Sequence, residues 1–465
     1  MSNKFGKDLT VGSIPKHLLA FSVPMLIGNL LQVSYSVVNT IWIGNKIGED
    51  AVGAAAVSFP IIFLLIALAS GVTMATTILV SQYYGAKDYA MVEKTVNNSF
   101  SVTLILGVIL TIAGIFSSDF LLKLMRTPPE IFQMASSYLK ITLAGFILMY
   151  FGFLIPAILR GIGDTVTPLA FMAIGIAINA VLDPLMIIGI GPFPRLGLNG
   201  AAYASLIAQS IAVVLTLVYL NRKSHIVAVN PKKFILEKNL TLLLFKIGIP
   251  SVIQQSLVSL GAFFITSFVN DFGKSAASAF GAAGRVDQIA FMPAMSISMA
   301  VSALTGQNMG ANKPERVREI FTWGVVMTSV ITLLVSLVAV ILPGFILSVF
   351  GFGHGSPGFD IGVTYLRIEG ASYILFAIMF VSNGVINGAG HTMTTMVFSL
   401  LSLWIIRVPL AALLSRTSLG ITGIWIAIVI SYAVVMIVSL LYYFSGRWKN
   451  TAVKIKMSPV PELEP

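Results

Sequence analysis

Twelve long apolar stretches constrain what this chain of 465 residues can fold into. A helix of about 20 apolar residues crosses the hydrocarbon core of a bilayer, and irregular backbone is not tolerated there because it finds no hydrogen-bond partners. The stretches lie near residues 17–43, 51–80, 97–118, 136–158, 166–191, 200–221, 243–270, 280–305, 321–346, 366–388, 394–415 and 421–444. The first stretch includes Pro24 and is too long for the core of a signal peptide, so we expect a retained helix. The sequence therefore predicts an all-α integral membrane protein with twelve transmembrane helices.

The composition supports a membrane location. Hydrophobic residues make up 57% of the chain and charged residues 10%, whereas a soluble domain carries about 25% charged residues. A chain with so few charges cannot cover its whole surface with groups that water solvates well.

The net charge of +11 is distributed unevenly along the chain. Lys and Arg gather in alternate connections, and such loops stay on the cytoplasmic side of a membrane. The clusters are Lys4, Lys7 and Lys16; Arg222, Lys223, Lys232, Lys233, Lys238 and Lys246; Lys313, Arg316 and Arg318; and Arg447, Lys449, Lys454 and Lys456. We therefore expect a multi-pass protein of the cytoplasmic membrane with both termini in the cytoplasm. A basic chain could also bind nucleic acid, but the clusters follow the loops, so we expect no such partner.

The chain also repeats itself at an offset of about half its length. Four pairs of similar segments keep their order along the two halves: 80–87 and 305–312, 138–141 and 365–368, 160–165 and 387–392, and 196–200 and 419–423. Same-direction repeats of this kind are typical of secondary transporters, which bind substrate between the halves. The predicted organisation is an N-terminal lobe at 1–221, a cytoplasmic linker at 222–242, a C-terminal lobe at 243–446 and a cytoplasmic tail at 447–465.

No catalytic or nucleotide-binding motif accompanies the apolar stretches. The sequence has no phosphate-binding P-loop, no HExxH and no GxSxG. It contains no cysteine, and its four histidines are not spaced as metal ligands. We expect no enzymatic activity, no metal centre and no cofactor, so uphill transport would use an ion gradient.

Ionisable residues inside apolar spans are costly and mark functional sites. Asp183 is the clearest case, and Asn179, four residues earlier, shares its helix face. Pro184 lacks an N–H and so frees the carbonyl of Ala180. A carboxylate, an amide and a loosened carbonyl together predict a cation or proton site. The alternative is that Asp183 lies near a helix end and bonds only to backbone.

The matching region of the second half lacks this chemistry. Val408 stands where the first half has Asp183, and Trp404 stands where it has Asn179. Arg407, next to them, is expected to snorkel or to pair structurally rather than to bind substrate. The predicted cation site therefore belongs to the first half alone.

Three other polar segments are expected to have structural roles. Asp287 is expected to form an ion pair with Arg285 at the outer mouth. Asp164 is expected to cap a helix after a tight glycine turn. Residues 84–96 and their counterpart 309–321 are expected to form short amphipathic helices on the cytoplasmic surface.

The chain as a whole resembles the multidrug and toxic compound extrusion (MATE) family. The matching segments are Pro24, Val38-Asn39-Thr40-Ile41-Trp42-Ile43-Gly44, Gln82-xx-Gly85-Ala86 with its echo Gln307-xx-Gly310-Ala311, RGIGDTVTP at 160–168, Asn179-xxx-Asp183-Pro184 and Gly197-Leu198-Asn199-Gly200-Ala201-Ala202. The resemblance implies two six-helix lobes around a central path. It also implies export of bulky, often cationic, amphipathic compounds in exchange for Na⁺ or H⁺.

The chain departs from the family's pattern in the first span. The branch that couples through the first lobe usually carries an Asp where this chain has Asn39. The resemblance then implies a site of Asn39, Asn179 and Asp183, with Ser205 where that branch places a Thr. One carboxylate remains instead of two, and either H⁺ or a Na⁺ held at Asp183 and Asn179 would suit it.

The second lobe is not expected to couple to an ion. The other branch places acidic residues in its seventh and tenth spans. Here the segments 250–257 and 372–378 contain none.

These features predict a rocking antiporter with a cavity between its lobes. Ion binding at Asp183 would rearrange the first span, bent near Pro24, with Pro184 as a second conformational residue. Gln32 and Tyr35 are expected either to line the substrate cavity or to pack. The alternative is a flippase for lipid-linked saccharides, which shares the duplicated plan. The expected partners are amphipathic small molecules and membrane lipid, with a monomeric protein.

Overall fold

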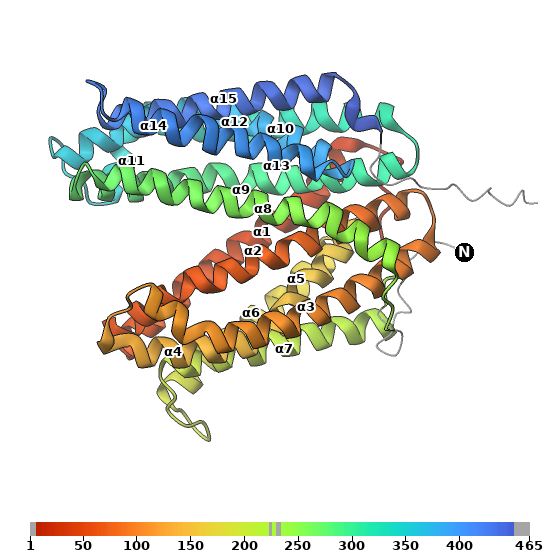
Figure 1. Cartoon of the computed structure of the whole chain (residues 1–465), viewed down its shortest axis with the longest axis horizontal. Helices are drawn as coiled ribbons and strands as arrows, with labels where there is room; N and C mark the ends of the chain where they lie inside the picture. The colour runs from red at the N-terminus through yellow and green to blue at the C-terminus, as the bar shows by residue number, and fades with distance from the viewer. Residues whose placement is uncertain (1–5, 223–225, 229–233, 451–465) are drawn as a thin grey trace, which may run out of the picture. The chain divides into compact units, whose positions relative to one another are not determined.

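The structure is a computed structural model, and it describes residues 6–222, 226–228 and 234–450 (Figure 1). Within these residues it consists of helices joined by turns and contains no strand. The helices are α1 (Ile14–Lys46), α2 (Glu49–Gly85), α3 (Tyr89–Leu124), α4 (Pro129–Ala144), α5 (Phe146–Gly161), α6 (Val166–Ile188), α7 (Leu198–Arg222), α8 (Lys238–Asn270), α9 (Lys274–Gly310), α10 (Pro314–Ile341), α11 (Pro343–Val349), α12 (Pro357–Gly388), α13 (Thr392–Leu400), the π-helix η1 (Leu401–Arg407), α14 (Val408–Leu414), α15 (Ile421–Phe444) and the 3₁₀ turn η2 (Arg447–Lys449).

The predicted all-α class with twelve spans is confirmed. In the described part of the chain, 11 helices are long and apolar enough to cross a membrane, with α13, η1 and α14 counted as one span. The twelfth span is the pair α4 and α5, which is bent by 48°. Gly145 lies at this bend, where an added Cβ would lie 1.8 Å from Leu206 of α7. Only glycine fits here without displacing that side chain.

The helices form two compact units whose boundaries fall inside two helices. Unit 1 contains residues 6–8 and 24–249, and unit 2 contains residues 9–23 and 250–450. The first turns of α1 therefore belong to unit 2, and the first turns of α8 belong to unit 1. The predicted lobes assigned 9–23 and 243–249 the other way. Parts of the predicted linker and tail, 223–225, 229–233 and 451–465, lie outside the described residues.

Hydrogen bonds hold each of these two segments, 9–23 and the start of α8, to the unit that it joins. In unit 2 the backbone N–H of Leu9 donates to Gln307 Oε1 (2.9 Å), and Arg316 donates to the carbonyl of Gly12 (3.0 Å). In unit 1 the backbone N–H of Glu237 donates to Asn98 Oδ1 (2.8 Å). The exchange is therefore fixed by polar contacts beside the helix ends.

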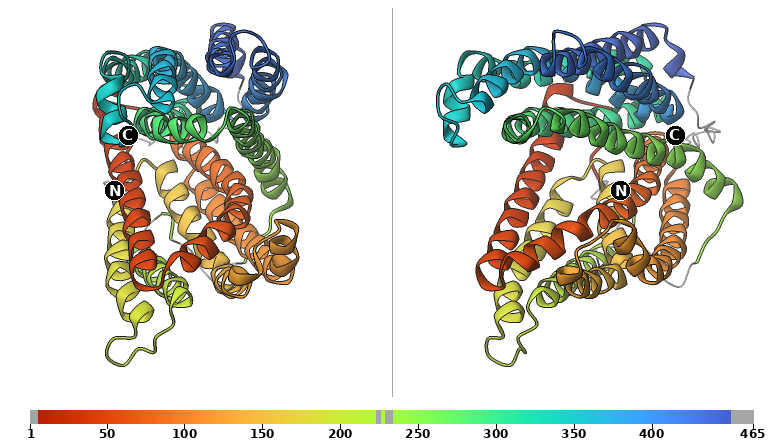
Figure 2. Two further views of the ribbon diagram at one scale, coloured as in Figure 1. Left: turned by 90° about the vertical axis from the view of Figure 1, so that its left-hand side faces the viewer. Right: turned by 60° about the vertical axis from the view of Figure 1, so that its left-hand side comes forward.

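Both units repeat one packing plan. In unit 1, α2 packs against α3, α4 and α5, and α6 packs against α7. In unit 2, α9 packs against α10 and α12, and α15 packs against α12 and α14. The views in Figure 2 show α6 and α7 side by side, with the loop 189–197 extending beyond their ends.

The repeated glycine segments, 196–200 and 419–423, connect the last two spans of each unit. Gly197 and Gly420 have left-handed backbone, with φ of +56° and +53°. A Cβ added to Gly200 would lie 2.4 Å from the carbonyl oxygen of Met186, and one added to Gly423 would lie 2.7 Å from the backbone of Leu414. The motif is therefore retained in both halves because the backbones approach so closely.

The predicted short amphipathic helices at 84–96 and 309–321 are wrong. The chain turns at Lys87 and at Asn312, which have φ of +59° and +56°, and the next spanning helix begins at once. Asp88 caps α3 by accepting a hydrogen bond from the N–H of Met91 (3.1 Å). The predicted cap at Asp164 is confirmed, since its carboxylate accepts from the N–H groups of 166 and 167.

The two halves also differ in their fifth spans. α6 remains an α-helix through Pro184, whereas the matching span contains the π-helix η1 directly before Pro409. A proline ring clashes with the carbonyl four residues earlier, and a π-helical turn is one way in which a helix accommodates such strain. Arg407 is the last residue of this π-helix.

Candidate functional site

α6 turns its polar residues inward. Its buried residues are Asn179, Asp183, Met186 and Ile187, and the rest of the helix is half-exposed or exposed. This i, i+4, i+7, i+8 spacing forms one stripe. Asp183 is 2% exposed and Asn179 is 4% exposed, so this stripe buries the two polar side chains together with two apolar ones, while most other apolar side chains of α6 face outward.

A hydrogen-bonded cluster forms around Asp183 in unit 1. Asn179 Nδ2 donates to Asp183 Oδ1 (3.0 Å), and the hydroxyl of Tyr35 donates to Asn179 Oδ1. The Tyr35 hydroxyl also lies 3.4 Å from Asp183 Oδ2. Ser205 Oγ lies 3.4 Å from both the Tyr35 hydroxyl and Asn179 Oδ1. Three helices, α1, α6 and α7, thus converge on one buried carboxylate, which we call the Asp183 cluster.

The structure brings together three of the four residues expected at the cation site. Asn179, Asp183 and Ser205 lie in the cluster, whereas no described hydrogen bond joins Asn39 to any of them. Asn39 is half-buried, and its Oδ1 is buried without a hydrogen-bond partner among the described residues. This oxygen is an acceptor that an entering cation or proton donor could satisfy.

The two residues expected to line the substrate cavity differ in their exposure and in their contacts. Gln32 is exposed on α1. Tyr35 is half-buried and belongs to the Asp183 cluster. Tyr35 shares a helix face with Asn39, but its hydrogen bond to Asn179 joins α1 to another helix, which no local pattern predicts.

Tyr138 of α4 is a further neighbour that the sequence analysis did not assign. It interacts electrostatically with Asp183. The segment containing it was noticed only as half of a repeated pair with Tyr365. Its proximity to Asp183 depends on the packing of α4 in unit 1, which no local pattern reports.

Comparison with known proteins identifies the family. A family model described as MatE matches residues 24–185 and again residues 250–413, so the two matches coincide with the repeat. The chain belongs to the MATE family. Probable multidrug resistance protein YpnP of Bacillus subtilis (strain 168) is 34% identical over 443 residues, which cover 95% of this chain and 97% of that protein.

Solved MATE structures share the whole fold. A MOP superfamily transporter from Pyrococcus furiosus, described as having a binding pocket of reverse polarity, superposes with a TM-score of 0.87 at 25% identity, covering 96% of this chain and 99% of its own. A multidrug resistance MATE family transporter of the MOP superfamily in an outward-facing conformation gives a TM-score of 0.87 at 25% identity, covering 96% and 98%. These similarities confirm twelve transmembrane helices in two lobes.

Unit 2 of this MATE protein holds a second acidic group, in which Asp287 is half-buried and Glu369 is buried. The carboxylate of Asp287 on α9 accepts hydrogen bonds from the hydroxyls of Tyr365 and Tyr373 on α12, the latter at 2.6 Å. The expected ion pair with Arg285 is wrong, because the guanidinium of Arg285 instead reaches Gln288 (3.5 Å). Asp287 therefore faces the interior of the unit.

Glu369 also lies in the tenth span, contrary to the expectation that this span carries no acidic residue. It is 3% exposed, its Oε2 lies 3.4 Å from Ser372 Oγ, and its Oε1 has no hydrogen-bond partner among the described residues. The expectation rested on the segment 372–378 alone, whereas the tenth span, predicted at 366–388 and observed as α12, includes Glu369. Asp287 interacts electrostatically with Glu369.

Arg407 supplies the positive charge of this second group. Its Nε donates to Ser431 Oγ (2.7 Å), and its guanidinium lies 4.5 Å from the centre of the Tyr432 ring. Arg407 also interacts electrostatically with Glu369. Unit 2 thus has two carboxyl groups with a nearby fixed cation, whereas the only carboxyl group of the Asp183 cluster has uncharged partners.

Proposed function

We propose that this chain is a secondary antiporter that exports amphipathic, often cationic compounds in exchange for protons, by alternating access of its two units. Its close relative is named a probable multidrug resistance protein and matches over nearly the full length of both chains. A shared fold and length support a shared class of substrate. The coupling ion and its site rest on the chemistry of the Asp183 cluster.

The Asp183 cluster carries the proposal because it changes its hydrogen bonds when a proton binds. An ionised carboxylate only accepts hydrogen bonds, and Asp183 accepts from Asn179 and faces the hydroxyl of Tyr35. A protonated carboxyl group donates one hydrogen bond and loses acceptor capacity. The bonds to Asn179 and Tyr35 must then rearrange, so protonation at Asp183 changes the contacts of α1.

α1 is suited to transmit this change. It contributes Tyr35 to the cluster in unit 1, while its residues before Pro24 belong to unit 2. A helix that starts in one unit and continues in the other must bend or shift when the units move. We propose that the Asp183 cluster biases α1 between two such arrangements.

A proton is preferred to Na⁺ because of how Asn179 is oriented. Its amide N–H points at Asp183, and its oxygen accepts from Tyr35. A sodium ion bound among the oxygens of Asp183, Asn179 and Tyr35 would displace the hydrogen bond from Tyr35 to Asn179 Oδ1. Binding of a proton needs only a redistribution of existing donors and acceptors.

Dye efflux from reconstituted vesicles tests the proposal, with the pH and Na⁺ gradients imposed separately. We expect the pH gradient to drive transport in the wild type and not in Asp183→Asn. The matched control is Asp119→Asn, which removes a half-exposed carboxylate of unit 1 that pairs with Lys140 (2.6 Å). Exposed pairs contribute little, so this control should transport normally.

Two results would contradict the proposal. Wild-type transport by Asp183→Asn under an imposed pH gradient would show that Asp183 is not the coupling site. Transport driven by Na⁺ alone would mean that the coupling ion at this site is Na⁺ and not a proton.

A further inference from the structure

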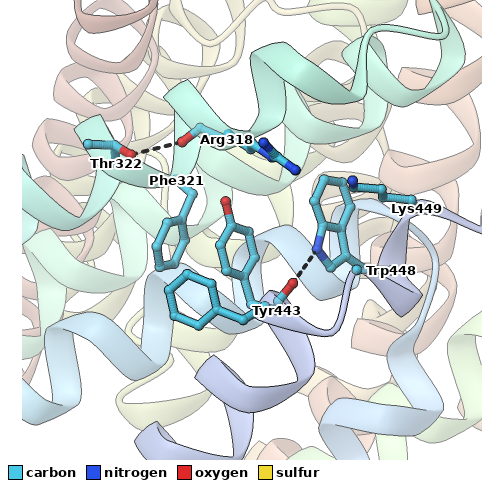
Figure 3. A pocket seen from close by; sticks show the side chains of 8 residues that line it. Arg318, Phe321, Thr322, Tyr443, Trp448 and Lys449 are labelled. Carbon is cyan, nitrogen blue, oxygen red and sulfur yellow. Dashed lines mark hydrogen bonds between the residues drawn. The ribbon is translucent and has the colours of Figure 1, made fainter.

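Unit 2 has a pocket of about 420 Å³ where α10 begins and α15 ends (Figure 3). We call it the α10–α15 pocket. Its lining residues are Arg318, Phe321, Thr322, Tyr443, Phe444, Gly446, Trp448 and Lys449. It contains none of the residues of the two buried acidic groups, so its chemistry must be considered separately from ion coupling.

The floor of the pocket is a row of three aromatic rings. Gly446 takes a left-handed backbone with φ of +71°, which folds the chain back after α15. The indole N–H of Trp448 then donates to the carbonyl of Tyr443 (2.8 Å), and the two rings lie nearly parallel, 5.7 Å apart. Phe321 stacks on Tyr443 with centroids 4.0 Å apart. Trp448 is only 1% exposed, so packing fixes this turn.

Two cations border the aromatic row. Arg318 comes from the first turns of α10 and Lys449 from η2, and both side chains are exposed. In Figure 3 they lie along one side of the row of rings. No carboxylate lines the pocket, and no salt bridge within the described ranges involves either cation. The pocket therefore offers positive charge that a bound anion could neutralise.

The pocket continues into an apolar surface. Phe444 lines it and is 74% exposed, and Leu441, three residues earlier on α15, is 66% exposed. Because α10 and α15 are long and apolar enough to cross a membrane, a surface at their ends would lie at the boundary between the hydrocarbon and the headgroups. Aromatic rings that combine an apolar body with a polar edge are enriched at this depth of a membrane, and basic residues beside them attract anionic lipid headgroups.

We propose that the α10–α15 pocket binds the phosphate group of an anionic phospholipid. Arg318 donates to the phosphate oxygens through its planar guanidinium, and Lys449 adds a second positive charge. The headgroup lies on the floor that includes Tyr443 and Trp448, and an acyl chain lies along Phe444. This proposal requires only that the chain spans a membrane, and it does not depend on which ion or compound is transported.

Binding of a fluorescent phosphatidylglycerol to the purified full-length protein in detergent tests the proposal. The test variant is Arg318→Gln with Lys449→Gln, and the matched control is Lys274→Gln with Arg416→Gln, which removes two cations outside the pocket. Each cation near a headgroup contributes a modest attraction, so we expect about 10- to 30-fold weaker binding by the test variant. The control should bind as the wild type does. An unchanged melting temperature without added lipid shows that the test variant is folded.

Three outcomes would overturn the proposal. Equal weakening in the control variant would mean that overall charge, not the pocket, attracts the lipid. Equal competition by phosphatidylcholine would remove the requirement for an anionic headgroup. Competition by inorganic phosphate at the concentrations at which phosphatidylglycerol competes would assign the pocket to a free anion instead of a lipid.

Discussion

Tyr35 is the residue that ties α1 to the buried carboxylate. Its hydroxyl donates to Asn179 and lies within reach of Asp183, and it is the only α1 side chain joined to them by a described hydrogen bond. Its aromatic ring takes no part in these hydrogen bonds. The hydroxyl and the ring can therefore be separated by substitution.

Replacing Tyr35 by Phe removes the hydroxyl and keeps the ring. A hydrogen bond involving a charged group contributes about 1.5–3 kcal/mol, which corresponds to roughly a tenfold effect or more. We expect efflux driven by a pH gradient to fall by about that factor, measured in vesicles at equal protein content. Tyr203→Phe is the matched control because Tyr203 is 41% exposed on α7 of the same unit. Equal rates in the two variants would show that the hydroxyl has no role in coupling.

Arg407 and Glu369 form a second case in which single residues decide the behaviour of a buried group. Removing Arg407 leaves Asp287 and Glu369 without their nearby fixed cation. We expect Arg407→Gln to destabilise the protein by about 2 kcal/mol and Glu369→Gln to restore much of this loss in the double variant. Thermal unfolding in detergent of the two single variants and the double variant measures the coupling. Additive effects would mean that the two side chains do not interact.

At the residue level the sequence predicted the part of the site that lies on one helix. Asn179 and Asp183 are four residues apart in an apolar span, so their common face follows from the helical period. Tyr35 could not be assigned to them because its partners come from another helix. Glu369 was missed for a different reason: it lies just before the segment that was searched. Long-range packing, not residue type, accounts for the first error.

At the level of elements, α1 and α8 have corresponding breaks. α1 passes from unit 2 to unit 1 at Pro24, and α8 passes from unit 1 to unit 2 at Pro250. Proline removes one hydrogen bond from the helical ladder, which lowers the resistance to bending. The two prolines occupy the same place in the repeat, so both crossings have the same local flexibility.

Substituting either crossing proline should therefore slow transport. Pro24→Ala and Pro250→Ala each restore an N–H and stiffen the helix at the crossing. We expect efflux rates several-fold below the wild type with unchanged amounts of protein in the membrane. Pro60→Ala is the control, since Pro60 lies inside α2, which belongs wholly to unit 1. If the control slows transport as much as the crossing variants, general helix stiffness and not the crossing is responsible.

The elements themselves were largely predictable from the sequence, whereas their exchange between units was not. Hydropathy is a local property, so twelve spans could be located, including the bent pair α4 and α5. The assignment of 9–23 to unit 2 depends on contacts such as that between Leu9 and Gln307, far apart in the chain. The π-helix before Pro409 likewise has no hydropathy signal, because it changes the helical period and not the composition.

In the molecule as a whole, the duplicated halves share one helical plan but carry their acidic residues on different helices. Tyr138 faces Asp183 in unit 1, and its repeat partner Tyr365 donates to Asp287 in unit 2. The acid comes from α6 in one unit and from α9 in the other. Among the described residues beside these acids, only those of unit 2 include a fixed cation, Arg407. The repeat therefore preserves the aromatic frame while each unit places its carboxylate on a different helix.

The orientation of the whole molecule follows from the distribution of its charge and can be tested directly. The chain has no cysteine, so a single introduced thiol reports its own location. We propose that the turn before α10 and the first turns of that helix, which together contain Lys313, Arg316 and Arg318, face the cytoplasm, because positively charged segments beside spans stay on that side. His354 is exposed in the loop before α12, and Glu315 is exposed in the first turn of α10, and the two are predicted to lie on opposite sides. A membrane-impermeant maleimide applied to intact cells should label His354→Cys but should label Glu315→Cys only after the membrane is made permeable. Labelling of Glu315→Cys in intact cells, with protection of His354→Cys, would show that the proposed orientation is wrong. Protons that enter the cell would then cross the structure in the opposite direction.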